Sequence, residues 1–228
     1  MAAQDDRPPA ADDPADHPAD HPTGDPAGDP AGDTVRAEKS ALRREVLGGR
    51  GALPPDVIAE CGERIAAALL QQPELAAARR VAAYVGIGTE PPTQPLLDAL
   101  FDSGVGDSGV QVLLPVLRGD DDLDWAAYSG PDSLTVGRHG LVQPLGQALG
   151  AAAVADCDVL LCPGLAVDPE GFRLGRGGGS YDRALARAEA STWTCVLLYD
   201  GEERERVPRA EHDRPVDAVA TPNGVRRF

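Results

Sequence analysis

Short apolar runs recur along most of this chain and alternate with segments of helical pattern. Two of these runs, VAAYVGI at 81–87 and VQVLLPVL at 110–117, flank a helical segment that Thr93 is placed to cap. Strands that alternate with helices predict a largely parallel sheet covered by helices on both faces. We therefore expect an α/β fold whose ligands lie beyond the carboxyl ends of the strands. The remaining predicted strands are LDWAAYS at 123–129, DVLLC at 158–162, TCVLLY at 194–199 and DAVAT at 217–221.

Two further helices are expected ahead of the first strand. Thr34 is placed to cap a basic helix that ends at Gly48 and Gly49, and a second, packing helix follows Pro54 and Pro55. In the basic helix, Lys39 and Arg43 are four residues apart and share one face. Taken alone, such a charge cluster favours a solvated surface.

The first 33 residues differ from the rest of the chain. From position 14 they run in tetrads, PADH PADH PTGD PAGD PAGD, without an apolar side chain larger than alanine. Such a segment cannot bury enough apolar surface to fold, so we expect a disordered tail over 1–33 and one domain over 34–228. Nine Asp and one Arg in this tail carry half of the chain's net charge of −16.

A glycine-rich stretch between a predicted strand and a predicted helix, Cys162 to Arg183, is the leading candidate for chemistry. Glycines let backbone amides approach a ligand, and Ser180 is placed to cap the next helix, so an anion there would meet several donors. A flexible linker is the alternative, but the apolar flanks argue against it. The stretch lacks the Gly-Lys-Ser/Thr end of a P-loop, and Ser180 breaks the dinucleotide pattern. Its glycines are at 164, 171, 175, 177, 178 and 179, and its arginines include Arg173 and Arg176.

A carboxylate, Glu90, follows the first predicted strand, as the glycine-rich stretch follows the strand DVLLC. Both segments are therefore expected to border one crevice. On sequence physics alone, an exposed loop carboxylate remains the favoured reading of Glu90.

Charge and cysteine content restrict the partners. An acidic body argues against binding nucleic acid, which requires a basic face. No secretory signal or apolar span of membrane length is present, so we expect a cytoplasmic protein that does not contact membranes. Four cysteines without CxxC spacing do not suggest zinc or disulfides. We also expect a monomer that acts on small molecules.

Six segments, in order, now point to one family. These are K-x-x-L-R at 39–43, E-x-x-T at 90–93, LLP at 113–115, G-L-x-x-P at 140–144, the core P-G-x-x-x-D with R-L-G-R-G-x-G-x-Y-D at 163–182, and P-x-x-x-x-D at 208–213. Over most of 36–222 the chain resembles the 5-formyltetrahydrofolate cyclo-ligases, also called methenyltetrahydrofolate synthetases. The long core is the specific part of this resemblance.

The resemblance implies a three-layer α/β/α fold, NagB/RpiA/CoA-transferase-like, and an enzyme that uses ATP and Mg²⁺ to convert 5-formyltetrahydrofolate to 5,10-methenyltetrahydrofolate, ADP and phosphate. It assigns catalysis to Arg176 and Tyr181 and places Val85, Glu90 and Tyr181 at the folate. It assigns Mg²⁺ to Asp182 and Asp213. The nucleotide residues that it implies are Lys39, Ser40, Ala41, Leu42, Arg43, Arg173, Leu174, Gly175, Arg176, Gly177, Gly178, Gly179, Ser180 and Tyr181.

The chain departs from the family pattern at three positions. Ser180 stands where many members have an aromatic residue, Gly178 where some have lysine, and Gln143 where glutamate is frequent. Two alternatives therefore remain: a module that binds nucleotide or folate without turnover, and an enzyme of the same fold that uses ATP on a non-folate substrate.

Overall fold

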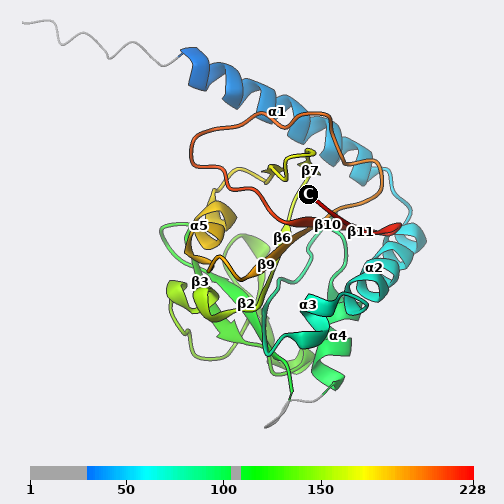
Figure 1. Ribbon diagram of the computed structural model, residues 1–228, viewed down its shortest axis with the longest axis vertical. Coiled ribbons are helices and arrows are strands. Elements are labelled where there is room, and N and C mark those ends of the chain that lie inside the picture. Colours follow the sequence, from blue (N-terminus) through cyan, green and yellow to red (C-terminus); the bar gives the residue numbers. More distant parts are fainter. Residues whose placement is uncertain (1–29, 104–108) are drawn as a thin grey trace, which may run out of the picture.

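The computed structural model describes residues 30–103 and 109–228. Most of the predicted tail, residues 1–29, lies outside the described residues. The helices are α1 Pro30–Gly51, α2 Pro55–Leu70, α3 Pro73–Ala77, α4 Gln94–Asp102 and α5 Ser180–Arg187, with 3-10 helices η1 Pro131–Ser133, η2 Arg138–Gly140 and η3 Ala151–Asp156 (Figure 1). The strands are β1 Arg80–Ala82, β2 Gln111–Leu117, β3 Leu123–Ala127, β4 Leu134–Val136, β5 Val142–Pro144, β6 Val159–Pro163, β7 Ala166–Val167, β8 Arg173–Leu174, β9 Trp193–Leu197, β10 Ala218–Thr221 and β11 Gly224–Arg227.

Seven strands form the central sheet, in the order β11-β10-β9-β6-β1-β2-β3. The five central strands are parallel, and an antiparallel strand closes each edge. Strand order therefore confirms the largely parallel sheet predicted from the alternating pattern. The edge strand β11 and the small sheets β4–β5 and β7–β8 were not predicted, because their strands are only two to four residues long and show no clear strand pattern.

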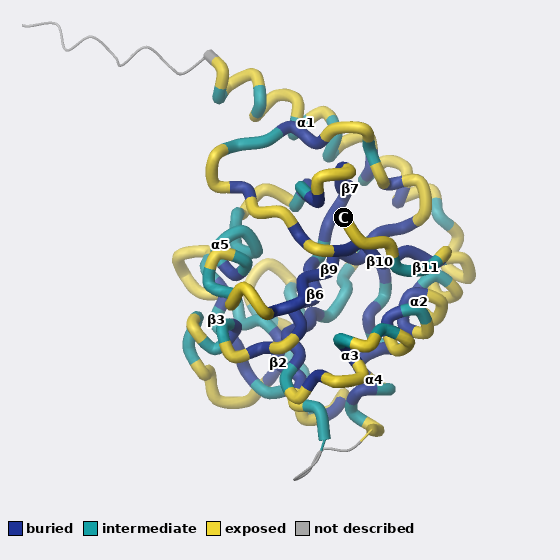
Figure 2. The backbone as a smooth tube through the Cα atoms, viewed as in Figure 1, coloured by how far each residue is buried: buried dark blue, intermediate teal, exposed yellow. Residues whose placement is uncertain are grey.

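Helices cover both faces of this sheet, which gives the expected three layers. On one face, α2 and α4 pack on alternate strand residues such as Val112, Leu114 and Leu161. On the other face, η3 and α5 cover Leu113, Leu160 and their neighbours. Figure 2 shows the central strands buried between these outer layers, whose solvent-facing sides are exposed. None of the helices in the described part of the chain is long and apolar enough to cross a membrane.

The first helix lies apart from these layers and packs on the β7–β8 hairpin. Val46 of α1 is buried with Leu165, Leu174 and Val207, and Leu42 packs against this group. In Figure 1, α1 passes over β7 and the surrounding loops. It thus brings its basic side chains to the end of the sheet that carries the glycine-rich stretch.

The limits of α1 differ from the prediction at both ends. The helix begins at Pro30 instead of Thr34, so four residues of the predicted tail are helical, and it continues through Gly48 and Gly49 to Gly51. Neither Gly48 nor Gly49 takes a positive φ. The extra turn is held by Arg50, whose side chain is buried against the body of the protein.

Arg50 makes a buried, two-pronged ion pair. Its Nε and Nη2 atoms each donate to a different carboxylate oxygen of Glu202 at 2.7 Å, and Nη2 also donates to the carbonyl of Gly164 at 2.7 Å. The amide of Tyr199 donates to Glu202 Oε2 at 2.9 Å, and the Arg50 guanidinium lies 5.2 Å from the Tyr199 ring centre. Arg50 therefore fastens the end of α1 to the loops that follow β6 and β9.

Thr93 also acts differently from the prediction. It is the N-cap residue of α4 but makes no side-chain capping bond. Its hydroxyl instead donates to the Tyr84 carbonyl at 2.6 Å and accepts from the Gly86 amide at 3.0 Å. The side chain thus fixes the loop between β1 and α4, in which Glu90 lies.

Removal of the buried positive charge of Arg50 should destabilise the folded protein strongly. We expect Arg50→Met to lower the free energy of unfolding by about 3–5 kcal/mol, because it leaves Glu202 buried without its cation. Urea denaturation measures this loss. The matched control is Arg227→Met, which breaks an exposed pair with Glu74 and should cost less than about 1 kcal/mol. Equal losses in the two variants would contradict the assignment.

Candidate active site

A cavity of about 500 Å³ opens beyond the carboxyl ends of β1 and β6. This is the place predicted for a ligand in a parallel sheet. Its lining residues come from α1, the loop after β1, the glycine-rich stretch, the β2–β3 turn and two later loops. They include Lys39, Arg43, Ile87, Glu90, Leu117, Asp121, Leu123, His139, Leu141, Gly164, the run 173–182, His212 and Asp213.

Two cations of α1 reach this cavity from one helix face. Lys39 Nζ lies 2.5 Å from Asp213 Oδ2, and Arg43 Nε donates to the Gly175 carbonyl at 2.8 Å. Burial lowers the pKa of Arg43, and the nearby Asp213 partly offsets this effect. The solvated-surface reading of Lys39 and Arg43 is therefore wrong.

The other predicted positions of this helix segment do not line the cavity. Ser40 and Ala41 lie on other sides of α1, and Leu42 packs against the β7–β8 hairpin. Val85 also lies outside the lining and packs, half-buried, against the core beneath α2 and α4. Any effect of these four residues on a ligand in the cavity is therefore indirect, through the lining residues next to them.

The glycine loop, residues 175–179, forms one wall. Gly177 has a φ of +117° and Gly179 a φ of +67°, whereas Gly175 takes an ordinary φ and has open space where a Cβ would point. A side chain at Gly177 would be strained and would also point at the Arg43 guanidinium, 3.5 Å away. The backbone of this loop therefore lies bare on the cavity surface.

Two of the predicted phosphate glycines are required by packing. A Cβ at Gly164 would come within 2.5 Å of Val196 Cγ2, and one at Gly171 would come within 2.3 Å of the Val216 carbonyl oxygen. Gly171 also has a φ of +81° and does not line the cavity. Both glycines allow close approach to a neighbouring strand or loop.

Helix α5 begins one residue earlier than the capping prediction requires. Gly179 is the N-cap residue, and Ser180 is the first helical residue. The Ser180 hydroxyl donates to the Asp121 carbonyl at 2.6 Å instead of capping the helix. The amides at the start of α5 nevertheless adjoin the glycine loop.

Two carboxylates lie near the glycine loop, each paired with a cation. Arg173 Nη1 donates to Asp182 Oδ1 at 3.1 Å, and Asp213 holds Lys39. The Arg214 amide also donates to Asp182 Oδ1, at 3.2 Å, so the chain just after Asp213 lies against Asp182. No group of three or more metal-binding side chains occurs in 30–103 or 109–228.

These two carboxylates still fit the Mg²⁺ that the resemblance implies. Mg²⁺ prefers oxygen ligands, keeps several waters and takes one or two carboxylates together with substrate phosphates. Asp182 and Asp213 are such oxygen donors, and both line the cavity beside the glycine loop. Their roles as Mg²⁺ ligands remain a prediction.

Glu90 is nearly buried, contrary to the exposed-loop reading. Its side chain is 10% exposed, Oε2 accepts from the Ile87 amide at 3.1 Å, and Oε1 accepts from Arg176 Nε at 2.9 Å. The Tyr199 hydroxyl donates to its carbonyl at 3.2 Å. Arg176, half exposed, thus bridges the glycine loop and the segment after β1.

Tyr181 contributes a buried hydroxyl without a hydrogen-bond partner in the described residues. Burial raises the pKa of this phenol well above its ordinary value, so the group is neutral at neutral pH. Its ring meets that of Tyr84 edge-on, with ring centres 6.5 Å apart. A buried hydroxyl without a partner is uncommon in a folded protein, which makes this cavity-lining residue a candidate for contact with a ligand.

Several lining residues were not predicted. Asp121 and His139 are the non-glycine residues with positive φ in the described ranges, at 60° and 54°, and both line the cavity. Nothing in the sequence indicates these backbone conformations. Leu141 is a specified position of the segment 140–144 and His212 an unspecified position of the segment 208–213, both of which were used for the family resemblance.

Comparison with known proteins identifies the family. The model of the 5-formyltetrahydrofolate cyclo-ligase family matches residues 35–222. The chain belongs to this family. A 5-formyltetrahydrofolate cyclo-ligase of Mycolicibacterium smegmatis is 40% identical over 149 residues, 63% of this chain and 74% of the relative. The cyclo-ligase of Escherichia coli K12 is 32% identical over 77% of this chain and 96% of its own length.

A solved structure shares both fold and sequence with this cyclo-ligase family member. The 5,10-methenyltetrahydrofolate synthetase of Aquifex aeolicus superposes with a TM-score of 0.70 and is 32% identical, covering 83% of this chain and 92% of its own. This likeness supports the three-layer fold and the family assignment together.

Gly177 and Gly175 allow a direct test of backbone strain in the glycine loop. We expect Gly177→Ala to lower the free energy of unfolding by about 1–3 kcal/mol, because alanine rarely adopts its φ of +117°. Gly175→Ala, with ordinary φ and open space, should be close to neutral. Thermal and urea unfolding measure both variants, and an equal effect would show that the loop conformation differs from the one described.

Proposed function

We propose that this protein converts 5-formyltetrahydrofolate to 5,10-methenyltetrahydrofolate, with ATP as co-substrate and release of ADP and phosphate. The observation that carries the proposal is one cavity lined by a bare glycine loop, two cations from α1 and a nearly buried Glu90. Family membership supports the same reaction.

The glycine loop and the start of α5 form the proposed nucleotide side. Backbone amides and a helix N-terminus favour anions, and Lys39, Arg43, Arg173 and Arg176 bring positive charge to the same wall. Catalysis of phosphoryl transfer consists mostly of positioning and of charge stabilisation, so these groups match its needs. Arg176 is the most exposed of the three arginines that form side-chain hydrogen bonds here, and it can exchange its bond to Glu90 for one to a bound phosphate.

Glu90 marks the proposed folate side. Its carboxylate accepts from Ile87 and Arg176 in the free protein, and it is positioned to orient polar atoms of the folate ring. Tyr181 lines the same cavity as Glu90 and the glycine loop, and its buried hydroxyl has no partner in the described residues. Its neutral phenol can donate a hydrogen bond to the formyl group or to a transferred phosphate.

The bond changes follow from the chemistry of a formamide, whose oxygen is a poor leaving group. The formyl oxygen takes the γ-phosphoryl group while the bond to ADP breaks. N10 then attacks the formyl carbon, loses its proton and closes the ring, and departure of phosphate gives the methenyl product. The protein holds the two substrates in line for the first step and shields the activated formyl group from water.

Mg²⁺ is proposed as the accompanying ion, held by Asp182 and Asp213 together with nucleotide phosphates. When bound, it neutralises phosphate charge. The pairing of these carboxylates with Arg173 and Lys39 means that each carboxylate would exchange or share its cation when the ion and nucleotide enter.

A monomer in a reducing compartment is part of the proposal. The four cysteines have free thiols, and three of them are buried, which suits the cytoplasm. Sedimentation of the purified protein tests the first point.

The reaction itself has a simple test. Purified protein, 5-formyltetrahydrofolate, ATP and Mg²⁺ should together produce the methenyl chromophore, and omission of ATP or Mg²⁺ should abolish it. Nucleotide binding without product would favour a binding module. ADP release stimulated by another small molecule, but not by the folate, would favour a non-folate substrate.

Loss of the bridging arginine should reduce turnover strongly. We expect Arg176→Ala to lower kcat by roughly 100-fold, the scale for one positioned charge at a transition state. Chromophore formation under saturating substrates measures it. Arg64→Ala, which removes an exposed cation from α2, is the control and should retain the wild-type rate. A wild-type rate for Arg176→Ala would refute this role.

A further inference from the structure

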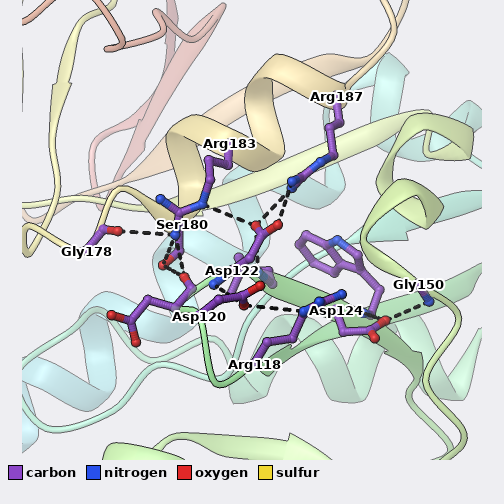
Figure 3. Close-up of polar contacts among 12 residues, drawn as sticks. Arg118, Asp120, Asp122, Asp124, Gly150, Gly178, Ser180, Arg183 and Arg187 are labelled. Atoms are coloured by element: carbon purple, nitrogen blue, oxygen red, sulfur yellow. Dashed lines mark hydrogen bonds and ion pairs between the residues drawn. The ribbon is translucent and has the colours of Figure 1, made fainter.

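The turn between β2 and β3, residues 118–122, is tied to α5 by an ion-pair cluster outside the cavity (Figure 3). Arg187 donates to both carboxylate oxygens of Asp122, with Nη1 at 2.9 Å from Oδ1 and Nη2 at 2.5 Å from Oδ2. Arg183 Nε adds a contact to Oδ1 at 3.3 Å. The side chain of Asp122 is only 14% exposed, so this cluster is better shielded than an ordinary surface pair.

A second set of bonds joins the same turn to the glycine loop. The Asp121 carbonyl accepts from Ser180 Oγ at 2.6 Å and from Arg183 Nη2 at 2.5 Å. The same Arg183 nitrogen lies 3.3 Å from the Gly178 carbonyl oxygen. Arg183 therefore touches the turn and the glycine loop together, and Ser180 contributes a hydroxyl where many family members have an aromatic residue.

The backbone of the turn is set for this contact. Asp121 has a φ of 60°, which costs a non-glycine residue free energy and persists only where the surroundings hold it. The turn closes on itself through the Arg118 amide, which donates to the Asp122 carbonyl at 2.9 Å. The strained residue is thus the one whose carbonyl receives both donors from α5.

Some residues of this contact line the cavity, and others lie behind the lining. Leu117, Asp121 and Leu123 line the cavity, as do Gly178 and Ser180 on the opposite side of the contact. Asp122, Arg183 and Arg187 do not line it. They can therefore act on a ligand only through the residues that they hold.

We propose that Asp122, with Arg183 and Arg187, is a positioning residue that clamps the β2–β3 turn to the start of α5 and so holds Gly178 to Ser180 in the conformation that receives the phosphates of ATP. This inference rests on the proposed function for the identity of the ligand. These three side chains then raise the affinity for ATP without touching it.

The charge of the clamp persists over a wide pH range. The hydrogen bond from Arg187 is the largest cause that lowers the pKa of Asp122 to about 2, with the Leu123 amide and Arg183 contributing. Arg183, Arg187 and the neighbouring Asp120 are the charged groups around it. Because the folded-state pKa is depressed, the stabilisation is complete above the ordinary pKa near 3.8 and is lost as the pH falls toward 2. Asp122→Asn should lack this part of the acid transition, and an unchanged transition would contradict the pairing.

Steady-state kinetics distinguish positioning from simple stabilisation. We expect Arg187→Ala and Asp122→Asn to raise the KM for ATP about 10-fold while the KM for the folate and kcat change less than about 3-fold. Arg187→Lys, which keeps one charged donor, should recover part of the loss. Arg80→Ala is the matched control: its side chain is 34% exposed against 33% for Arg187, it pairs with Asp156, and it lies at the opposite end of β1 from the cavity.

Two outcomes would overturn the clamp. One is a wild-type KM for ATP in both variants, and the other is an equal change in both KM values and kcat that Arg80→Ala reproduces. If the wild-type protein makes no methenyl product, the proposed function fails, and calorimetric titration with ATP tests the clamp instead. If ATP does not bind at all, amide hydrogen exchange over 175–183 decides: exchange should be about 10-fold faster in Arg187→Ala than in Arg80→Ala, and equal rates would refute it.

Discussion

The buried pair between Arg50 and Glu202 holds this structure together at its site. A guanidinium removed from water is costly, and the protein offsets that cost with two bonds to Glu202 and one to the Gly164 carbonyl. Because Arg50 ends α1, the pair also fixes the helix that presents Lys39 and Arg43. Through Tyr199, whose hydroxyl reaches the Glu90 carbonyl, the same network supports the opposite side of the cavity.

The cations around the cavity are already engaged before a ligand arrives. Lys39 is paired with Asp213, Arg43 with the Gly175 carbonyl, Arg173 with Asp182, and Arg176 with Glu90. An entering anion must therefore exchange partners with protein groups instead of meeting free charge. This arrangement makes the affinity of the site a difference between two sets of hydrogen bonds.

Much of the fold could be predicted because its signals are local. Apolar runs of strand length and helix-forming segments between them fixed the parallel core, and the glycine-rich stretch marked one wall of the cavity. The missing parts depend on contacts distant in sequence. Arg50 follows two glycines that usually end a helix, and only its partner 152 residues away keeps that turn helical. The left-handed backbone of Asp121 and the contact of Ser180 likewise depend on tertiary neighbours, which no local pattern records.

The docking of α1 also has a consequence for the order in which the chain is made. This helix is synthesised well before Glu202 and Asp213, which hold it in place. At about 5–20 residues per second, Arg50 waits roughly 8–30 s for Glu202, which lies 152 residues later. During this interval, the apolar side of α1 that later covers the β7–β8 hairpin has no lasting partner. An apolar helix face left without its full set of partners is a binding site for chaperones until the later segments are complete.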